Sequence, residues 1–212
     1  MNIALIGASG YVGAPILTEA LNRGHHVTAI VQHPEKLPAH ERLRGVSVNV
    51  LDQTALAAAL EGHEAVLSAF SGHADTDVRA YYGRGIQSIF TAVRAARVPR
   101  LLVVGGAGSL EVAPGLQLVD TPEFPAQWKG SAEGARDALN LLRAETTLDW
   151  SLLSPSALLQ PGERTGKFRL GGDQLLVDAQ GESRISVQDY AVALIDELEQ
   201  PRHSRQRFTV GY

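Results

Sequence analysis

Short apolar runs alternate with longer segments of helical periodicity along most of the chain. Ile86, Ile89, Phe90 and Val93, for example, recur at intervals that place them on one face of a helix. Such alternation favours a parallel sheet with right-handed crossovers. The pattern predicts strands over residues 3–6, 26–31, 46–50, 65–70, 101–104, 150–153 and 207–210. It predicts helices from Gly13 to about residue 22, over 53–60, 78–96 and 125–144, and up to residue 199 from an N-cap at Ser186.

Three segments interrupt this alternation. Residues 34–38 are bounded by prolines and leave room for only one helical turn. Residues 111–125 contain three prolines and predict a loop that could lie over a site. Residues 155–185 include a glycine-rich stretch with short apolar pieces at 168–170 and 175–177, which predicts a hairpin-like, substrate-side excursion. We therefore expect an α/β protein: one Rossmann-type domain over residues 1–212, built on a doubly wound parallel sheet, with this small C-terminal excursion.

The first strand stops at a glycine-rich turn that leads directly into the first helix. Gly7 would allow the sharp turn, Gly10 would let a pyrophosphate approach the backbone, and Gly13 would let the helix pack closely on the strand. The positive end of the helix dipole would point at the anion. This order of strand, glycine turn and helix predicts a dinucleotide site that includes the intervening Ser9, Tyr11 and Val12.

Composition narrows the classes of partner. The 212 residues are 44% hydrophobic and 20% charged, with a formal net charge of −4, so we expect no nucleic-acid partner. There are no cysteines, and the seven histidines lack metal-ligand spacing, so we expect no metal site. No apolar run approaches the roughly 20 residues of a membrane helix, and the first strand leaves no room for a signal peptide. These features favour a cytoplasmic location without membrane contact, as a monomer or homodimer.

In an open parallel sheet the ligand lies beyond the carboxyl ends of the strands. The candidate cofactor-binding residues beyond the glycine turn are therefore those that follow the later strands: Gln32, His33, Lys36, Asp52, Ala69, Phe70, Ser71, Gly72, Gly105, Gly106 and Pro155. Asp52 has two interpretations. It could accept from an adenine amino group, or it could cap the helix that begins at Gln53.

The end of the second strand bears on the choice of cofactor. An acidic residue there would hold the ribose 2′-hydroxyl and repel a 2′-phosphate, but this chain has Gln32. His33, Lys36, Arg42 and Arg44 add positive charge nearby, although Arg42 and Arg44 could equally form a solvated face. The sequence thus favours NADP(H) over NAD(H) and leaves use of both open.

Candidate catalytic groups are few. No tyrosine is followed at the fourth position by lysine, the unit with which short-chain dehydrogenases donate a proton, so carbonyl reduction by tyrosine is disfavoured. Ser109, just beyond the fifth strand, could orient the nicotinamide carboxamide or the substrate, or could simply bond within its own turn. Trp128 and Lys129 could stack on and pair with a planar anionic substrate, or could be a core and a surface residue.

Several segments together carry a family resemblance. They are residues 7–13, 31–36, 103–109, 153–157, 161–167 and 206–210. With them the chain resembles the atypical short-chain dehydrogenase/reductase superfamily. Within that superfamily it is most similar to the NADH-flavin reductase group, whose members also resemble mammalian biliverdin B-type flavin reductase. Relatives often carry arginine at the position of Gln32 and tyrosine at that of Trp128.

The resemblance implies hydride transfer from a reduced nicotinamide to a small-molecule acceptor such as a flavin or quinone. Such an acceptor becomes a delocalised anion that solvent can protonate, so the missing tyrosine–lysine unit is compatible with activity. An alternative is a non-catalytic redox sensor that binds the dinucleotide and signals by protein contact. A third possibility, a nucleotide-sugar epimerase or dehydratase, is disfavoured by the missing unit.

Overall fold

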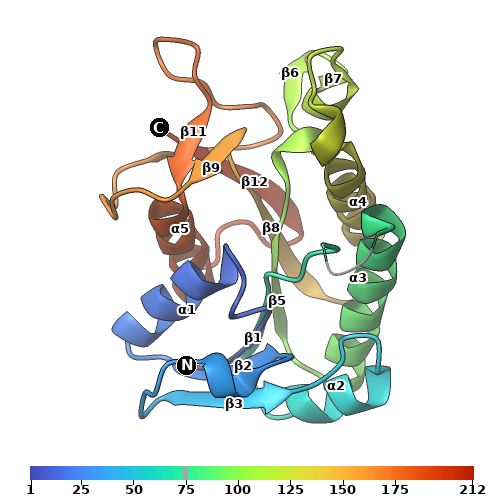
Figure 1. Ribbon diagram of the computed structural model, residues 1–212, viewed down its shortest axis with the longest axis vertical. Coiled ribbons are helices and arrows are strands. Elements are labelled where there is room, and N and C mark those ends of the chain that lie inside the picture. The colour runs from blue at the N-terminus through green and yellow to red at the C-terminus, as the bar shows by residue number, and fades with distance from the viewer. Residues whose placement is uncertain (74–75) are drawn as a thin grey trace.

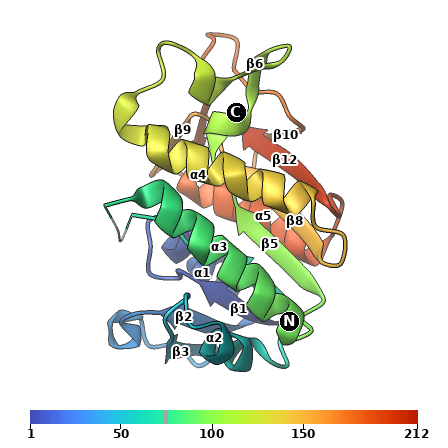
Figure 2. The same ribbon diagram turned by 90° about the vertical axis from the view of Figure 1, so that its right-hand side faces the viewer.

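The structure, a computed structural model, describes residues 1–73 and 76–212. The expected alternation folds into three layers, with one large sheet between two layers of helices (Figures 1 and 2). Among the described residues, no helix is long and apolar enough to cross a membrane.

The large sheet has eight strands in the order β10-β12-β8-β5-β4-β1-β2-β3. All neighbouring strands are parallel except β10, which runs antiparallel to β12 at one edge. The first half of the chain builds outward from β1 through β2 to β3, and the second half builds outward from β4 in the opposite direction. The sheet is therefore doubly wound, as predicted. The strands are β1 (Asn2–Ile6), β2 (His26–Val31), β3 (Leu43–Ser47), β4 (Ala65–Ser68), β5 (Arg100–Val104), β8 (Asp149–Ser154), β10 (Arg169–Gly171) and β12 (Gln206–Gly211).

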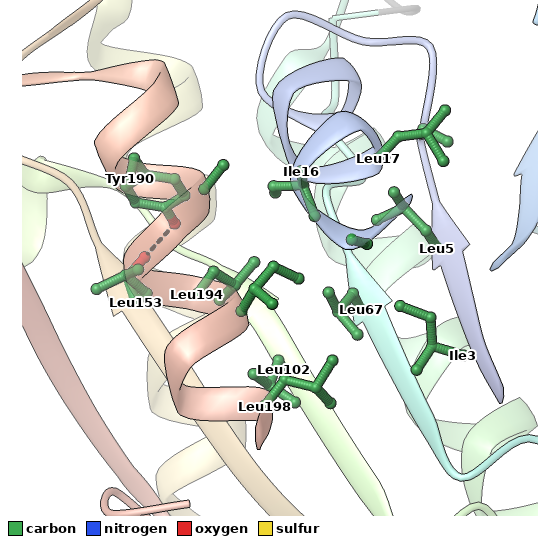
Figure 3. Packing of buried hydrophobic residues seen from close by; sticks show 14 of the residues in the cluster. Ile3, Leu5, Ile16, Leu17, Leu67, Leu102, Leu153, Tyr190, Leu194 and Leu198 are labelled. Atoms are coloured by element: carbon green, nitrogen blue, oxygen red, sulfur yellow. Dashed lines mark hydrogen bonds between the residues drawn. The ribbon is translucent and has the colours of Figure 1, made fainter. Parts of the chain in front are cut away.

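Helices cover both faces of the sheet, and each interface forms its own apolar core. One face is covered by α1 (Gly13–Asn22) and α5 (Val187–Glu199), and the other by α2 (Gln53–Leu60), α3 (Val78–Ala95) and α4 (Ala126–Arg143). Figure 3 shows the first core, in which Ile16 and Leu17 of α1 and Leu194 of α5 pack on strand residues. The Tyr190 hydroxyl donates a 2.7 Å hydrogen bond to the Leu153 carbonyl, so its burial leaves no unpaired polar group.

The third strand was predicted three residues too late. β3 spans Leu43–Ser47 and pairs in register with Val27–Val31 of β2. It is an edge strand whose residues are half-buried or exposed, so its sequence carries little apolar signal. Val48 and Val50 supply the apolar pattern that suggested a strand, but they pack against the core beside α2 instead.

The predicted hairpin-like excursion was wrong in its form. β10 joins the large sheet through β12, and residues 175–177 form no strand. Leu158–Gln160 (β9) and Arg184–Ser186 (β11) form a small parallel sheet of their own. The predicted loop at 111–125 contains an antiparallel pair, β6 (Glu111–Ala113) and β7 (Leu116–Gln117), because Gly115 at φ +76° permits a tight turn between them.

Candidate functional site

The candidate site is the switch point of the sheet, named the crevice from here on, where the chain leaves two neighbouring strands in opposite directions. β1 and β4 pair directly, but β1 leads to α1 on one face and β4 leads to α3 on the other (Figure 1). Loops that diverge in this way leave space above the carboxyl ends of the two strands. Every candidate residue that follows β1, β4 or β5 lies at this edge of the sheet.

The glycine-rich turn is held together by close backbone packing. Gly7 has φ +79°, and a Cβ at this position would lie 2.7 Å from the Ala69 carbonyl oxygen. A Cβ on Gly13 would lie only 2.0 Å from the Gly7 carbonyl oxygen. Gly10 is less constrained, because a Cβ at this position would lie 3.2 Å from its nearest neighbour, the Gly7 carbonyl oxygen. The fold itself requires Gly7 and Gly13, whereas Gly10 leaves room for a ligand to approach the backbone.

The start of α1 is suited to an anion. Val12 occupies the N-cap position and makes no side-chain cap bond, and the first turn of the helix contains no acidic residue. The Ala14 amide already donates to the Gly10 carbonyl at 2.9 Å and Pro15 has no N–H, so the amides that would meet an anion are those of residues 11–13. The helix dipole adds positive potential there. Ser9 and Tyr11 are exposed beside this helix start. These residues fit a dinucleotide pyrophosphate.

The end of β2 carries a negative charge, that of Glu35, which the sequence analysis did not consider. Gln32, His33 and Lys36 are all exposed there, as a ribose subsite requires. His33 Nδ1, however, lies 3.1 Å from Glu35 Oε1. The backbone N–H of Glu35 itself and the neighbouring His33 lower the pKa of the Glu35 carboxyl, so it is ionised at neutral pH. The position of Glu35, three residues after Gln32, could have indicated this negative charge from the sequence alone.

Arg42 does not contribute charge to this subsite. Its carbonyl accepts from the Val27 amide at the start of β2, and its Nη1 lies 2.7 Å from where a Cβ on Gly24 would stand. The guanidinium is thus placed beside the turn that precedes β2, at the amino end of the sheet. Arg44, which pairs with Thr28, also lies in the early half of the strand. Of the two interpretations of Arg42, the structure therefore supports the solvated face and not positive charge near the ribose, because the strand begins earlier than predicted.

Asp52 acts as a helix cap. Its Oδ1 accepts from the Ala55 amide at 3.0 Å and so satisfies one free donor at the start of α2. The capping interpretation is confirmed. Because Asp52 is exposed, contact with an adenine remains a prediction.

The residues after β4 are partly occupied by packing. Ala69 and Phe70 are half-buried and Ser71 is exposed. The Phe70 ring stacks on Tyr82, with centroids 5.9 Å apart and planes inclined by 11°. A Cβ on Gly72 would lie 2.2 Å from the Val78 carbonyl oxygen, so this glycine is required by the approach of α3.

The residues after β5 and β8 are packed more tightly. The Gly105 amide donates to the Leu153 carbonyl at 2.8 Å, and a Cβ at Gly105 would meet Leu152 Cδ2 at 2.4 Å. A Cβ on Gly106 would lie 3.0 Å from Ala135 Cβ of α4. Pro155 is buried. This part of the crevice can offer a ligand mainly backbone atoms.

Ser109 lies in a helical turn after β5 and is only 3% exposed. Its Oγ accepts from Arg207 Nη1 at 3.4 Å, which is a contact that no spacing in the sequence predicts. Trp128 is 53% exposed near the start of α4, so it is no core residue, and Lys129 beside it is exposed too. The Trp128 ring faces the ring of His73, which follows β4, in an edge-on arrangement with the ring centroids 6.5 Å apart. The aromatic side chain therefore reaches the β4 side of the crevice.

Among the described residues, no group of three or more histidine, aspartate or glutamate side chains is placed to hold a metal ion. The fold defines a Rossmann-type protein, with a glycine turn between its first strand and first helix. The chain belongs to the NAD(P)H-binding family, whose sequence model matches residues 7–198.

Relatives share the whole length of the chain. The uncharacterized protein YwnB of Bacillus subtilis (strain 168) is 42% identical over 217 residues, covering 99% of this chain and 98% of that protein. A solved structure from Bacteroides thetaiotaomicron, described as a candidate epimerase, is 45% identical with a TM-score of 0.94, covering 100% of this chain and 96% of its own. The solved structure of a candidate NADH-flavin reductase from Streptococcus pneumoniae is 35% identical with a TM-score of 0.88. The match covers 100% of this chain and 99% of that chain.

Proposed function

We propose that this protein is an NAD(P)H-dependent reductase that passes hydride to a flavin, a quinone or a similar conjugated acceptor. The observation that carries the proposal is the cradle at α1. The start of α1 has no side-chain cap and Gly10 is less constrained than Gly7 and Gly13, which suits a pyrophosphate. Trp128 is exposed near the start of α4, where it could contact an acceptor. The bound nicotinamide supplies the hydride, and the chain has to bind it, orient it and admit the acceptor.

The tyrosines near the crevice support an acceptor that needs no protein acid. Burial raises the pKa of Tyr82 well above its ordinary value, and its ring is stacked on Phe70. The Tyr11 hydroxyl donates to the Leu159 carbonyl at 3.3 Å, and no lysine follows it at the fourth position. A conjugated acceptor takes up hydride as a delocalised anion, which solvent can protonate. Trp128 and Lys129, exposed at the rim, suit a planar ring system with negative charge.

The cofactor side favours NADPH over NADH and allows both. Gln32 does not repel a 2′-phosphate, and His33 and Lys36 attract one, whereas Glu35 opposes it. A cytoplasmic location and a monomeric or homodimeric state complete the proposal as predictions.

The test is steady-state oxidation of NADPH and NADH with FMN, FAD and a panel of quinones. Gly10→Val provides the control, because its side chain would fill the space left for the pyrophosphate. We expect acceptor-dependent turnover in the wild type and its loss in Gly10→Val. Absence of acceptor-dependent turnover above background in the wild type would overturn the proposal.

A second function, that of a dinucleotide-binding redox sensor, is favoured by the burial of Ser109, which keeps that hydroxyl from open solvent. Comparable affinities for oxidised and reduced cofactor, together with no turnover, would support the sensor. Nucleotide-sugar epimerisation is disfavoured by the missing tyrosine–lysine unit. Measured epimerase activity on any sugar nucleotide would reverse this order.

A further inference from the structure

The side chain of Tyr11 connects the glycine turn to a segment that lies far away in the chain. Its hydroxyl donates to the Leu159 carbonyl of β9 at 3.3 Å, across 148 positions of the sequence. β9 follows β8, and Figure 1 shows it above the start of α1. Tyr11 therefore joins the turn that would bind the cofactor to the segment that follows β8.

The carbonyl that accepts this hydrogen bond lies on the free edge of β9. Leu158 pairs in register with Arg184 of β11, and its amide donates to the Ser183 carbonyl at 2.9 Å. In a parallel pair, alternate residues of a strand bond to the partner strand, so the N–H and C=O groups of Leu159 point away from β11. The Leu159 side chain packs against the apolar core between the sheet and α1 and α5. Its carbonyl is thus held in a fixed place, facing the glycine turn.

The phenol of Tyr11, in contrast, is held weakly. The side chain is 60% exposed, so packing does little to fix it, and the hydrogen bond to Leu159 is what keeps the ring directed at β9. A single exposed hydrogen bond contributes little net free energy, and exposed side chains change rotamer rapidly. The ring can therefore exchange between a closed position on β9 and an open position in solvent.

The expected seat of the pyrophosphate lies directly beside this ring. Ala14 already donates to Gly10 and Pro15 has no N–H, so the amides free to meet an anion are those of residues 11–13. One of them is the amide of Tyr11 itself. A pyrophosphate bound there lies at the base of the Tyr11 side chain, and the closed ring spans the gap between the start of α1 and β9.

We propose that Tyr11 is a latch that retains the bound dinucleotide. Its hydrogen bond to Leu159 closes the crevice beside the pyrophosphate, and the bond has to break before the cofactor leaves. The inference rests on the proposed function in one respect, since it assumes a dinucleotide at the glycine turn. The latch acts on the pyrophosphate part of the ligand, so it slows the release of any ligand that contains ADP-ribose. A Tyr11 that served only the fold would change stability and leave the release rates unchanged.

ADP-ribose contains the adenine and pyrophosphate parts of the cofactor but lacks the nicotinamide, so it separates the two halves of the ligand. Stopped-flow fluorescence of NADH, with each ligand chased by an excess of the other, gives both dissociation rates. Tyr11→Phe keeps the ring and removes the hydrogen bond. We expect it to release NADH and ADP-ribose about 2- to 5-fold faster, the worth of one exposed hydrogen bond, with no slower association. Tyr11→Ala removes the ring as well and should release both ligands faster still.

Thr18→Val is the matched control. It removes another exposed hydrogen bond from a hydroxyl to a carbonyl, that from Thr18 to Ala14 at 3.0 Å, which lies within α1 and spans no gap. Both dissociation rates should stay at the wild-type values in this variant. Because Tyr11 is exposed, Tyr11→Phe should also keep the wild-type midpoint of urea unfolding, which separates release from stability.

Unchanged or slower release in Tyr11→Phe would overturn the inference. Faster release of NADH alone would overturn it too, because it would place Tyr11 against the nicotinamide, and so would an equal acceleration in Thr18→Val. A wild type that binds NADH but shows no acceptor turnover would instead overturn the proposed reductase function and leave this release test intact. A wild type that binds neither ligand would overturn both.

Discussion

Arg164 and Glu19 form a two-pronged ion pair that ties the loop after β9 to the helix after the glycine turn. Arg164 Nε donates to Glu19 Oε2 and Nη2 donates to Oε1, each at 2.7 Å. Glu19 is only 4% exposed and is also bound by Arg23 at 2.7 Å. The hydrogen bond from Arg164, opposed by burial and helped by Arg23, lowers the pKa of the Glu19 carboxyl.

Replacing Arg164 should therefore lower stability in a pH-dependent way. Since Arg164 is itself about half exposed and Glu19 keeps Arg23, we expect Arg164→Ala to cost about 1 kcal/mol at pH 7. A carboxyl with a lowered native pKa contributes stability above its unfolded pKa of about 4.3, and that contribution is lost as the pH falls through the lower native pKa. Urea unfolding of both proteins at neutral and acidic pH should show a difference that shrinks on acidification. A constant difference would contradict the assignment, and Arg164→Lys should give an intermediate cost.

Alanine at two glycines of the turn should separate folding from binding. In Gly13→Ala the new Cβ meets the Gly7 carbonyl oxygen at 2.0 Å, so we expect failure to fold or a loss of more than about 3 kcal/mol. In Gly10→Ala the contact is 3.2 Å, so the variant should fold with a loss of about 1 kcal/mol or less. Its cofactor affinity should nevertheless fall by about tenfold or more, measured by calorimetry. Gly83→Ala is a control inside α3 with no neighbour within 4 Å. It should leave cofactor affinity unchanged and raise stability by up to about 1 kcal/mol, because alanine favours a helix more than glycine does.

Two substitutions at Asp52 should distinguish the cap from adenine contact. Asp52→Ala should lower the free energy of unfolding by about 1 kcal/mol, because the Ala55 amide loses its acceptor. Asp52→Ser keeps a capping oxygen on a shorter side chain and should unfold like the wild type. If the carboxylate also holds the adenine, Asp52→Ser should still weaken NADPH and NADH equally. Unchanged cofactor affinity in Asp52→Ser would show that Asp52 serves only as the cap of α2.

Substitution at Gln32 should change cofactor preference. Gln32→Asp adds a carboxylate at the expected ribose position, beside the existing charge of Glu35. Repulsion should weaken NADPH binding by about tenfold or more relative to NADH. Gln32→Asn is the uncharged control and should affect both cofactors to a similar degree. Equal effects of Gln32→Asp on the two cofactors would place Gln32 away from the ribose.

Periodic and local features of the sequence were sufficient for most of the architecture. The glycine turn between β1 and α1, the alternation of strands and helices, and the caps at Asp52 and Ser186 depend on residues within a few positions of one another. Backbone propensity and short-range hydrogen bonding act at that range, so the pattern of residue types reports them directly. The edge strand β3 was misplaced because its exposed residues lack that pattern.

The sequence by itself determined a doubly wound sheet, the glycine turn between β1 and α1, and the set of residues at the strand ends. Only the tertiary structure decided that β10 joins β12, that Arg42 lies at the amino end of the sheet, and that Ser109 is bound by Arg207 from 98 residues away. These relationships arise when distant segments share one buried space. Their geometry is set by side-chain packing and by the need to pair every buried charge, which local periodicity does not encode.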